Sequence, residues 1–422
     1  MYKSPTSQSD FLLLTINHNM KTLFNNYLNT FRGLSREVWW LALITLINRA
    51  GTMVVPFLSL YLNKDLGFSL VNIGWILSIY GLGATVGSLI GGKLADKIGF
   101  YRVMVFSLFG TGIMFILLQY LTTLLTFSLG IFVVMVVADS FRPAMFVAMS
   151  AYSKPENKTR SVTLIRLAIN LGFSAGPAVG GIIITTIGYS GLFWIDGITC
   201  ILATLLLINV LHPKKAKQLD NVTNENPKSI LKDKPFWLFF IAMTLFGIIF
   251  LQYFSTMPLY YKDIHFLSEL EIGLLLGMNG LIIFILEMPL IKWLENATYS
   301  KVALMVFGSL LVGGSFIVLI ITNWVGVLIL GMLLMTIGEM IVFPFSNAFV
   351  MERGKRGKLG EYMALYTVSF SISHVFGHNA GMRMVDKLGY DFTWIIISIL
   401  SIICVITLVF LKKSLISEKL KK

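Results

Sequence analysis

The sequence predicts an all-α membrane protein with twelve transmembrane helices in two parallel-repeat halves of six helices each. Hydrophobic residues make up 56% of the 422 residues and charged residues only 13%, whereas soluble domains are about 45–50% apolar and about 25% charged. Apolar runs repeatedly reach the ~20 residues that cross the hydrocarbon core as a helix. The second half of the chain also repeats features of the first half in the same order.

Polar residues, glycines and prolines divide the apolar runs into twelve expected spans. These are 38–62, 71–93, 101–121, 125–151, 161–186, 191–211, 236–261, 271–293, 302–321, 325–350, 361–384 and 391–411. The predicted organisation is a tail at 1–37, a first half at 38–211, a linker at 212–235, a second half at 236–411 and a basic tail at 412–422. Because the number of spans is even, both termini are expected on one side of the membrane.

Basic residues are distributed unevenly between the two expected sides. Of the 34 Lys and Arg residues, 27 fall in the tails and in the loops on the terminal side, four fall on the other side, and three lie inside spans. The positive-inside rule therefore predicts a multi-pass protein of the cytoplasmic (plasma) membrane with both termini in the cytoplasm. This topology also accounts for the net charge of +13 without nucleic-acid binding. Cys200 and Cys404 both lie inside spans, so neither a disulfide nor a metal site is expected.

The repeat relates residues of different kinds. At an offset of 200 residues, Asp139 matches Glu339 and Trp194 matches Trp394. Two six-helix units that run in the same direction are related by an axis along the membrane normal, and carriers of this kind bind substrate between the repeats. A central substrate cavity is therefore expected between the halves.

The segment after the second expected span reads GKLADKIGFYR over residues 92–102. Its glycines permit a tight connection, and Asp96 is placed to meet a helix N-terminus or an arginine. This segment resembles the signature loop of the major facilitator superfamily, although Phe100 and Tyr101 stand where a basic residue is usual. The resemblance extends over residues 38–411 and implies the major facilitator fold. It assigns a conformational-gate role to Gly92, Leu94, Asp96, Gly99 and Arg102.

The fifth expected span reads GFSAGPAVGG over residues 172–181. It resembles the glycine-proline motif of the antiporter branch of the superfamily, and segments 139–143 and 338–344 also resemble proton-antiporter multidrug exporters. Small residues let two helices approach closely, and a proline can kink a helix where the halves rock; generic membrane packing is the alternative. The gate residues expected here are Gly176, Pro177, Gly180 and Gly181.

Six charged residues lie deep inside the expected spans: Arg49, Arg142, Arg166, Asp139, Glu287 and Glu339. The set is neutral, as expected for groups that pair across a bundle interior. The three acids are candidates for proton coupling, because an ionisable group at bilayer depth is costly and is a functional suspect by default. Glu339 ranks first because no cation lies within a turn of it, whereas Asp139 has Arg142 one turn away and is interpreted as an ion-pair member. A structural ion pair or substrate contact is the alternative for each acid.

Polar residues on the expected cavity helices are candidates for substrate contact. Those of the first span recur at helical spacing and predict a polar stripe that faces water. The two histidines of the eleventh span lie one turn apart and favour a proton relay or a plain hydrogen-bonded pair over a metal site. Asp196 is expected near the outer surface, close to a helix N-terminus. The substrate-cavity candidates are Arg49, Asn48, Thr52, Arg142, Gln252, Tyr253, His374 and His378.

The resemblance implies a secondary transporter that works by alternating access, and the buried acids favour proton-coupled efflux of small lipophilic or amphipathic molecules. A proton-coupled importer and a lipid flippase on the same fold are the alternatives. The sequence carries no zincin pair, Gly-x-Ser-x-Gly elbow or phosphate loop, so an enzyme is not expected. The expected partners are the lipid bilayer, a small-molecule substrate and protons. The chain is expected to act as a monomer without a cofactor or a metal, and to use the proton gradient as its energy source.

Overall fold

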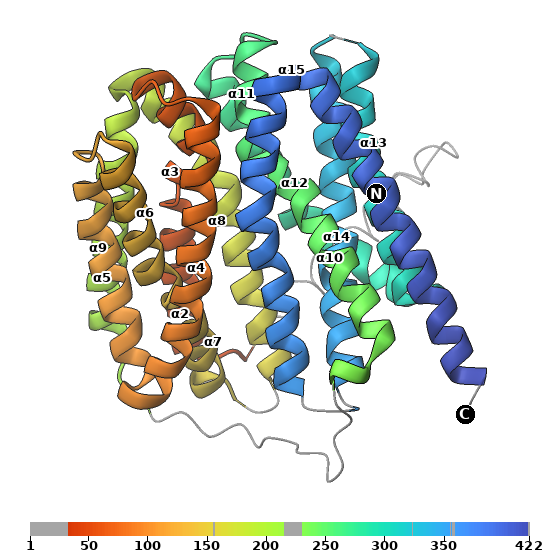
Figure 1. Cartoon of the computed structure of the whole chain (residues 1–422). Helices are drawn as coiled ribbons and strands as arrows, with labels where there is room; N and C mark the ends of the chain where they lie inside the picture. Colours follow the sequence, from red (N-terminus) through yellow and green to blue (C-terminus); the bar gives the residue numbers. More distant parts are fainter. Residues whose placement is uncertain are drawn as a thin grey trace, which may run out of the picture.

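The computed structural model describes residues 33–154, 157–214, 230–322, 324–354, 356 and 359–420, and these form helices joined by short turns, without a strand. Figure 1 shows one bundle of roughly parallel helices, with the first half of the chain on the left and the second half on the right. Most of the predicted N-terminal tail and most of the predicted linker lie outside the described residues.

The first half contains α2 (Arg36–Ala50), α3 (Val54–Leu60), the π-helical turn η1 (Tyr61–Asp65), α4 (Leu70–Ile98), α5 (Phe100–Leu118), α6 (Leu124–Asp139), α7 (Phe141–Tyr152), α8 (Lys158–Ile187) and α9 (Tyr189–Val210). The second half contains the 3-10 turn η3 (Ile230–Lys232), α10 (Lys234–Ser255), α11 (Met257–Asp263), α12 (Glu269–Glu295), α13 (Lys301–Ile321), α14 (Gly326–Gly354) and α15 (Leu359–Leu420). Eleven stretches within the described residues are long and apolar enough to cross a membrane. The last of them holds two helices that meet at Gly389, where φ is 77°. Twelve spans result, as the sequence predicts.

Three of the predicted spans are interrupted. The first span breaks between α2 and α3, the fourth at Ser140 between α6 and α7, and the seventh at Thr256 between α10 and α11. Two helices extend beyond the expected spans: α4 continues to Ile98, so the connection after it reduces to Gly99 with φ 87°, and the predicted C-terminal tail is helical up to Leu420. Glycine has no Cβ and can adopt a φ of 87° without a steric cost, which explains why position 99 is a glycine.

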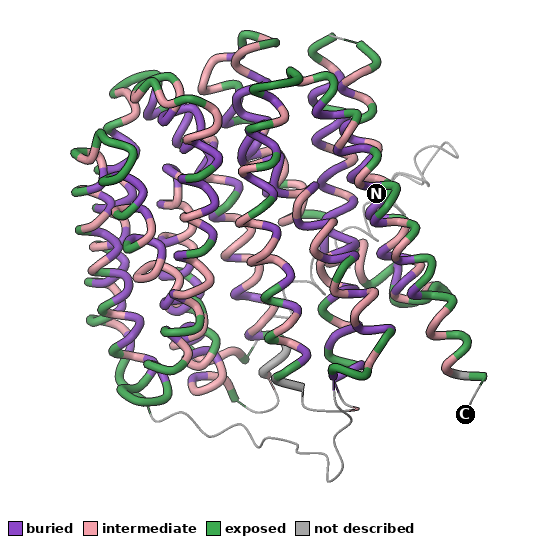
Figure 2. The backbone as a smooth tube through the Cα atoms, viewed as in Figure 1, coloured by how far each residue is buried: buried purple, intermediate pink, exposed green. Residues whose placement is uncertain are grey.

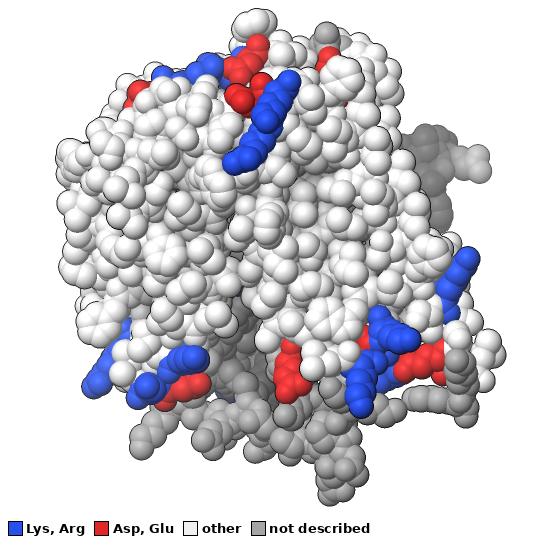
Figure 3. Space-filling view, in the orientation of Figure 1, with Lys and Arg blue, Asp and Glu red and all other residues white. Residues whose placement is uncertain are grey.

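The two ends of the bundle are distinguishable. We call the end where α9 finishes and α10 starts the linker end, and the other the opposite end; in Figure 1 the linker end is at the bottom. On the face drawn in Figure 3, charged side chains gather near both ends and leave an uncharged band between them. Exposed tryptophans flank this band, with Trp39 and Trp293 toward the linker end and Trp75 and Trp194 toward the opposite end. Tryptophan is enriched at membrane interfaces, so these positions indicate where the bilayer lies.

Burial follows the same arrangement. Figure 2 shows buried residues where helices face one another and exposed residues on the outside of the bundle. One core cluster contains residues of both halves, and its first-half members, such as Phe57, Ile73 and Phe193, lie toward the opposite end. A second cluster, which includes Phe100 and Phe141, contains first-half residues toward the linker end only. The core that joins the halves is therefore concentrated at the opposite end.

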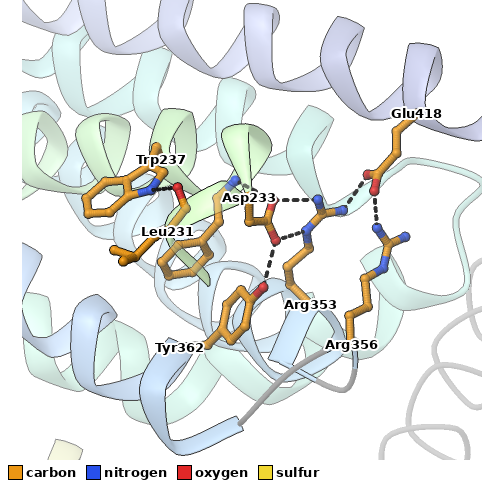
Figure 4. Close-up of polar contacts among 8 residues, drawn as sticks. Leu231, Asp233, Trp237, Arg353, Arg356, Tyr362 and Glu418 are labelled. Carbon is orange, nitrogen blue, oxygen red and sulfur yellow. Dashed lines mark hydrogen bonds and ion pairs between the residues drawn. The ribbon is translucent and has the colours of Figure 1, made fainter. Parts of the chain in front are cut away.

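An ionic network ties the second half together at the linker end (Figure 4). The Arg353 Nε donates to Asp233 Oδ2 at 2.7 Å, and its Nη1 donates to Glu418 Oε2 at 2.6 Å. Tyr362 Oη also donates to Asp233 Oδ2, at 2.8 Å. The Asp233 carboxylate additionally caps α10 by accepting from the Phe236 amide at 3.2 Å. The network therefore links the start of α10, the end of α14 and both ends of α15.

Asp233→Asn is expected to lower the free energy of unfolding by about 3 kcal/mol, because it breaks a mostly buried pair with Arg353. Burial raises the pKa of Asp233, but the hydrogen bonds from Arg353 and Tyr362 outweigh it and hold the pKa below its usual value. A depressed carboxyl pKa stabilises the fold above the unfolded-state pKa and loses this effect only as pH falls through the folded-state value. Thermal unfolding should therefore show the same loss at about pH 6 and about pH 8.

The control is Glu37→Gln, which removes a part-exposed pair with Lys214 and should change stability by less than about 1 kcal/mol. An equal effect of both substitutions, or an Asp233→Asn effect that vanishes between these two pH values, would contradict the role assigned to the network.

Candidate functional site

The halves meet mainly along two pairs of helices, α4 with α15 and α8 with α12, and α3 makes smaller contacts with α10 and α11. The α8–α12 contact is tight: a Cβ on Gly181 would lie 2.6 Å from the Glu269 carbonyl oxygen, and a Cβ on Gly280 would lie 2.6 Å from the Ser174 amide nitrogen. The Ser174 hydroxyl donates to the Gly277 carbonyl at 2.8 Å. Only glycine permits this approach. Gly181, one of the predicted gate residues, therefore lies in the contact between the halves.

At the opposite end, polar contacts join the halves across this interface. Lys64 Nζ of the first half lies 2.7 Å from Asp263 Oδ1 of the second, and Tyr390 Oη, which is in the same half as Asp263, donates to Asp263 Oδ2 at 2.8 Å. Tyr189 Oη donates to Glu269 Oε1 at 3.4 Å. We call these five residues the opposite-end latch. Lys64 and Asp263 occupy equivalent positions in the two repeats, 199 residues apart.

At the linker end, the ion pairs stay within one half. Lys214 pairs with Glu37 in the first half, and Arg353 pairs with Asp233 and Glu418 in the second. The latch and the shared core thus hold the opposite end of the interface closed, whereas the ionic contacts at the linker end leave the two halves independent.

One ion pair between charged residues of the expected spans crosses the interface, nearer to the linker ends of α8 and α12 than to their opposite ends. Arg166 of α8 pairs with Glu287 of α12 through its Nη2, and Asn170 Nδ2 donates to Glu287 Oε2 at 3.0 Å. Glu287 thereby has a cationic partner and a neutral donor, both from the other half.

Glu339 has a different environment. Its side chain on α14 is only 6% exposed. Asn279 Nδ2 of α12 donates to Glu339 Oε1 at 2.8 Å and to Thr336 Oγ1 at 3.0 Å. Within the described part of the chain, no Lys, Arg or His forms an ion pair with Glu339, and Glu287 is the one charged group in electrostatic range. Glu339 is thus a buried acid without a cation to neutralise it, as its sequence context suggested.

The predicted Asp139–Arg142 ion pair was wrong. The two arginines nearest to Asp139, Arg49 and Arg142, lie within electrostatic range of its carboxylate, but neither is among the ion pairs of the described residues. The helix assignment is interrupted at Ser140, between α6 and α7, but the Ser140 backbone keeps helical angles of φ −64° and ψ −23°, so spacing of one turn is not enough to pair the two side chains. The Arg49 guanidinium lies 5.6 Å from the ring centroid of Phe173 instead.

The predicted water-facing stripe of the first span does not hold as a whole. Asn48 is buried and its amide contacts Cys200 Sγ of α9 at 3.7 Å. Thr52 Oγ1 turns back to donate to the Arg49 carbonyl at 2.6 Å. The stripe fails because the helix ends at Ala50, so residues beyond it no longer share a face with those before it.

Two second-half candidates are also packed away from a cavity. Tyr253 is 1% exposed, and its hydroxyl donates to Ser315 of α13 at 2.7 Å, inside the second half. Gln252 is fully buried and donates to the Gly377 carbonyl of α15 at 3.0 Å. Both residues therefore serve helix packing in this structure, and substrate contact by either would require rearrangement.

The two histidines lie on α15 where it packs on α4. His374 Nδ1 and His378 Nε2 are 3.1 Å apart, and Gly81 of α4 leaves space for the His374 ring. Among buried atoms of the described residues, His378 Nδ1 has no hydrogen-bond partner. The histidines contact each other rather than an acid. No group of three or more potential metal ligands exists in the described chain.

The gate residues divide into two groups. Leu94, Asp96, Gly99 and Arg102 are exposed at the linker end, and Gly92 lies within α4 near Pro143. Neither Asp96 nor Arg102 is among the ion pairs of the described residues, so of the two contacts predicted for Asp96, the one with an arginine is not made within the described chain. Gly176, Pro177 and Gly180 are buried in α8, where the two glycines face α2 and α3.

Asp196 is buried rather than near the outer surface. Its carboxylate accepts from the Met53 amide at 2.9 Å and from the Val54 amide at 2.9 Å. These donors form the start of α3, which has no side-chain cap of its own. Asp196 does lie at a helix N-terminus, as predicted, and the helix is α3, which starts after the break in the first span.

Sequence reasoning missed several polar partners. Asn170 follows Arg166 by four residues and Thr336 precedes Glu339 by three, so helical spacing placed each on the face of its charged neighbour. Asn279 precedes Gly280, a glycine that repeats Gly81 of the first half at an offset of 199. No local signal pointed to the latch, whose members come together only across the interface.

Two six-helix halves, tied at one end and crossed by buried charges, define a membrane transporter. The family model of the Major Facilitator Superfamily matches residues 41–378. The chain therefore belongs to the Major Facilitator Superfamily.

Individual relatives agree with this assignment. A "Na(+), Li(+), K(+)/H(+) antiporter" of Planococcus maritimus is 24% identical over 384 residues, covering 83% of this chain and 89% of that protein. The "MFS-type transporter SLC18B1" of Mus musculus is 27% identical over 394 residues, covering 86% and 83%. Among solved structures, a POT family transporter in complex with 5-aminolevulinic acid has a TM-score of 0.77 at 17% identity, covering 91% of this chain and 97% of that one. The nucleoside transporter NupG has a TM-score of 0.73 at 15% identity, covering 90% and 100%. These structural likenesses show the shared fold.

Proposed function

We propose that this chain exports small lipophilic or amphipathic molecules in exchange for protons, and that Glu339 carries the proton. The observation that carries the proposal is the burial of Glu339 without a cationic partner. A carboxyl group in this position must be neutral or must bind a cation, because an uncompensated charge in a low-dielectric interior is costly. The class of substrate rests on the resemblance of segments 139–143 and 338–344, together with the antiporter motif at 172–181, to those of proton-antiporter multidrug exporters. The relative named as an antiporter supports exchange with protons.

In this proposal the linker end faces the cytoplasm, because most Lys and Arg residues of the sequence lie on that side. The protein acts as a monomer in the plasma membrane and needs only the proton gradient as its energy source. The described conformation, with its latch closed, takes substrate from the cytoplasmic side. Rocking of the halves then opens the latch and breaks the Arg166–Glu287 pair, which spans the interface.

Ethidium, a lipophilic cation, tests the function. Purified protein in liposomes should move ethidium against its gradient when a pH gradient is imposed, and a protonophore should abolish this movement. Movement of ethidium in the same direction as protons would indicate an importer. Transfer of a labelled phospholipid between leaflets, without gradient-driven ethidium movement, would indicate a flippase.

The latch yields a separate prediction about conformation. Lys64→Asp and Asp263→Lys should each move the population toward a state open at the opposite end, and the double substitution should restore the starting distribution. The shift should be partial, since the pair is part exposed and screened by salt. Electron–electron double resonance between labels at Asp65 and Ile264, both exposed, reports the separation of the halves.

A matched control is Lys301→Asp, which breaks an exposed pair within the second half. It should leave the distance distribution unchanged. Equal distributions in the wild type and in both single latch variants would show that the pair does not hold the opposite end closed.

A further inference from the structure

Oxygen acceptors from α14 converge on one position next to α12. That position holds Nδ2 of Asn279, which lies 2.8 Å from Glu339 Oε1 and 3.0 Å from Thr336 Oγ1. The Thr336 hydroxyl donates its own proton to the Met332 carbonyl at 2.7 Å. Its lone pairs are therefore directed at the amide, and the position is enclosed by one anionic and one neutral oxygen acceptor.

An ionised Glu339 leaves a net charge of −1 around this position. Of the elements that pack against α14, α12 contributes Glu287, and Arg166 of α8 already neutralises it. Neither α13 nor α15 is found to place a charged group within electrostatic range of Glu339 among the described residues. A single positive charge completes the site, which favours a proton or a monovalent ion over a divalent ion.

We propose that a monovalent alkali cation, Na⁺ or Li⁺, binds at Glu339 in competition with the proton. The cation takes the place that Nδ2 holds in this structure, so the Asn279 side chain withdraws and turns its amide by half a turn, which directs Oδ1 instead of Nδ2 toward the vacated position. Carboxylate, hydroxyl and amide oxygens then surround the cation, and water completes its coordination. Hard cations prefer such oxygen ligands. This inference rests on the proposed protonation of Glu339 and adds a second ion for the same site.

Burial determines the size of the ion. Glu339 is 6% exposed and Thr336 is fully buried. A bare or partly hydrated alkali ion fits between two packed helices, whereas an organic ammonium group with its substituents does not. The site is therefore distinct in its chemistry from a surface for lipophilic cationic drugs.

Binding of radioactive ²²Na⁺ to the purified full chain in detergent tests the inference. We expect one Na⁺ per chain at alkaline pH, displaced by Li⁺ and by acidification but not by tetramethylammonium. Glu339→Gln should abolish binding, and Thr336→Val should weaken it by about tenfold or more. Thr407→Val and Glu295→Gln are the controls. Thr407 makes the same hydrogen bond to the carbonyl four residues earlier but is half-buried, and Glu295 is an exposed carboxylate of α12.

Absence of stoichiometric Na⁺ binding at alkaline pH, or equal binding by wild type and Thr336→Val, overturns the inference. If Glu339→Gln does not fold, the comparison of Thr336→Val with Thr407→Val still tests the inference, because valine preserves the shape of threonine. The ethidium assay separates this result from the proposed function. Gradient-driven ethidium transport without Na⁺ binding would support the proposed function and contradict the cation site. Na⁺ binding without ethidium transport would support the cation site and contradict the proposed function.

Discussion

Glu339→Gln is expected to abolish pH-driven transport while leaving folded protein in the membrane. Glutamine keeps the shape of the side chain and can still accept a hydrogen bond from Asn279, but it cannot exchange a proton. Ethidium movement under a pH gradient should fall to the level of protein-free liposomes, whereas the melting temperature of the purified variant should stay within a few degrees of the wild type. The loss is expected to be complete because the other acids inside the described spans have compensation: Glu287 pairs with Arg166, Asp139 lies within electrostatic range of two arginines, and Asp196 accepts from backbone amides.

Glu295→Gln is the matched control, since Glu295 is an exposed carboxylate on the neighbouring helix α12. It should retain transport. Undiminished pH-driven transport by folded Glu339→Gln would show that Glu339 does not carry the proton. Asp139 and Glu287 would then be the candidates for the proton carrier.

Asp196→Ala is expected to have the largest effect on stability. Two buried amides, those of Met53 and Val54, lose their acceptor, and each unsatisfied donor costs about 1–3 kcal/mol, or about 2–6 kcal/mol together. The start of α3 loses its cap, so the break in the first span next to Arg49 is no longer fixed. Thermal unfolding in detergent measures the loss. Asp196→Asn retains one acceptor oxygen and should be affected less.

Asp386→Ala removes an exposed aspartate of α15 and should change stability by no more than about 0.5 kcal/mol. If Asp196→Ala unfolds at the same temperature as Asp386→Ala, the carboxylate is not what holds the two parts of the first span together.

The fold could be predicted because hydrophobic length and charge asymmetry act locally. Each span can be recognised from a run of about 20 apolar residues. The repeat of Asp139 and Glu339 indicates the duplication without any knowledge of packing. The breaks in the first, fourth and seventh spans could not be predicted in the same way. A break such as that before α3 is tolerated because Asp196, far away in sequence, satisfies the freed backbone donors.

The same reason explains which site residues were misplaced. A helical wheel of the first span assumes one continuous helix, so it gave Asn48 and Thr52 a common face that the break removes. The Asp139–Arg142 pair failed because spacing of one turn along a helix leaves the rotamer of each side chain open. Glu339 was placed correctly because α14 is continuous, so its lack of a neighbouring cation within its own helix could be read directly from the sequence. Its partner Asn279 lies on another helix, so the contact could not be predicted from residues near Glu339 in the sequence.

The most direct test of the account is proton movement during transport. Liposomes that contain wild-type protein and a trapped pH indicator, given ethidium on one side without an imposed gradient, should show protons moving opposite to ethidium, and liposomes with Glu339→Gln should show none. Ethidium movement by wild type without any proton movement, or with protons moving in the same direction, would contradict the exchange of substrate for a proton at Glu339.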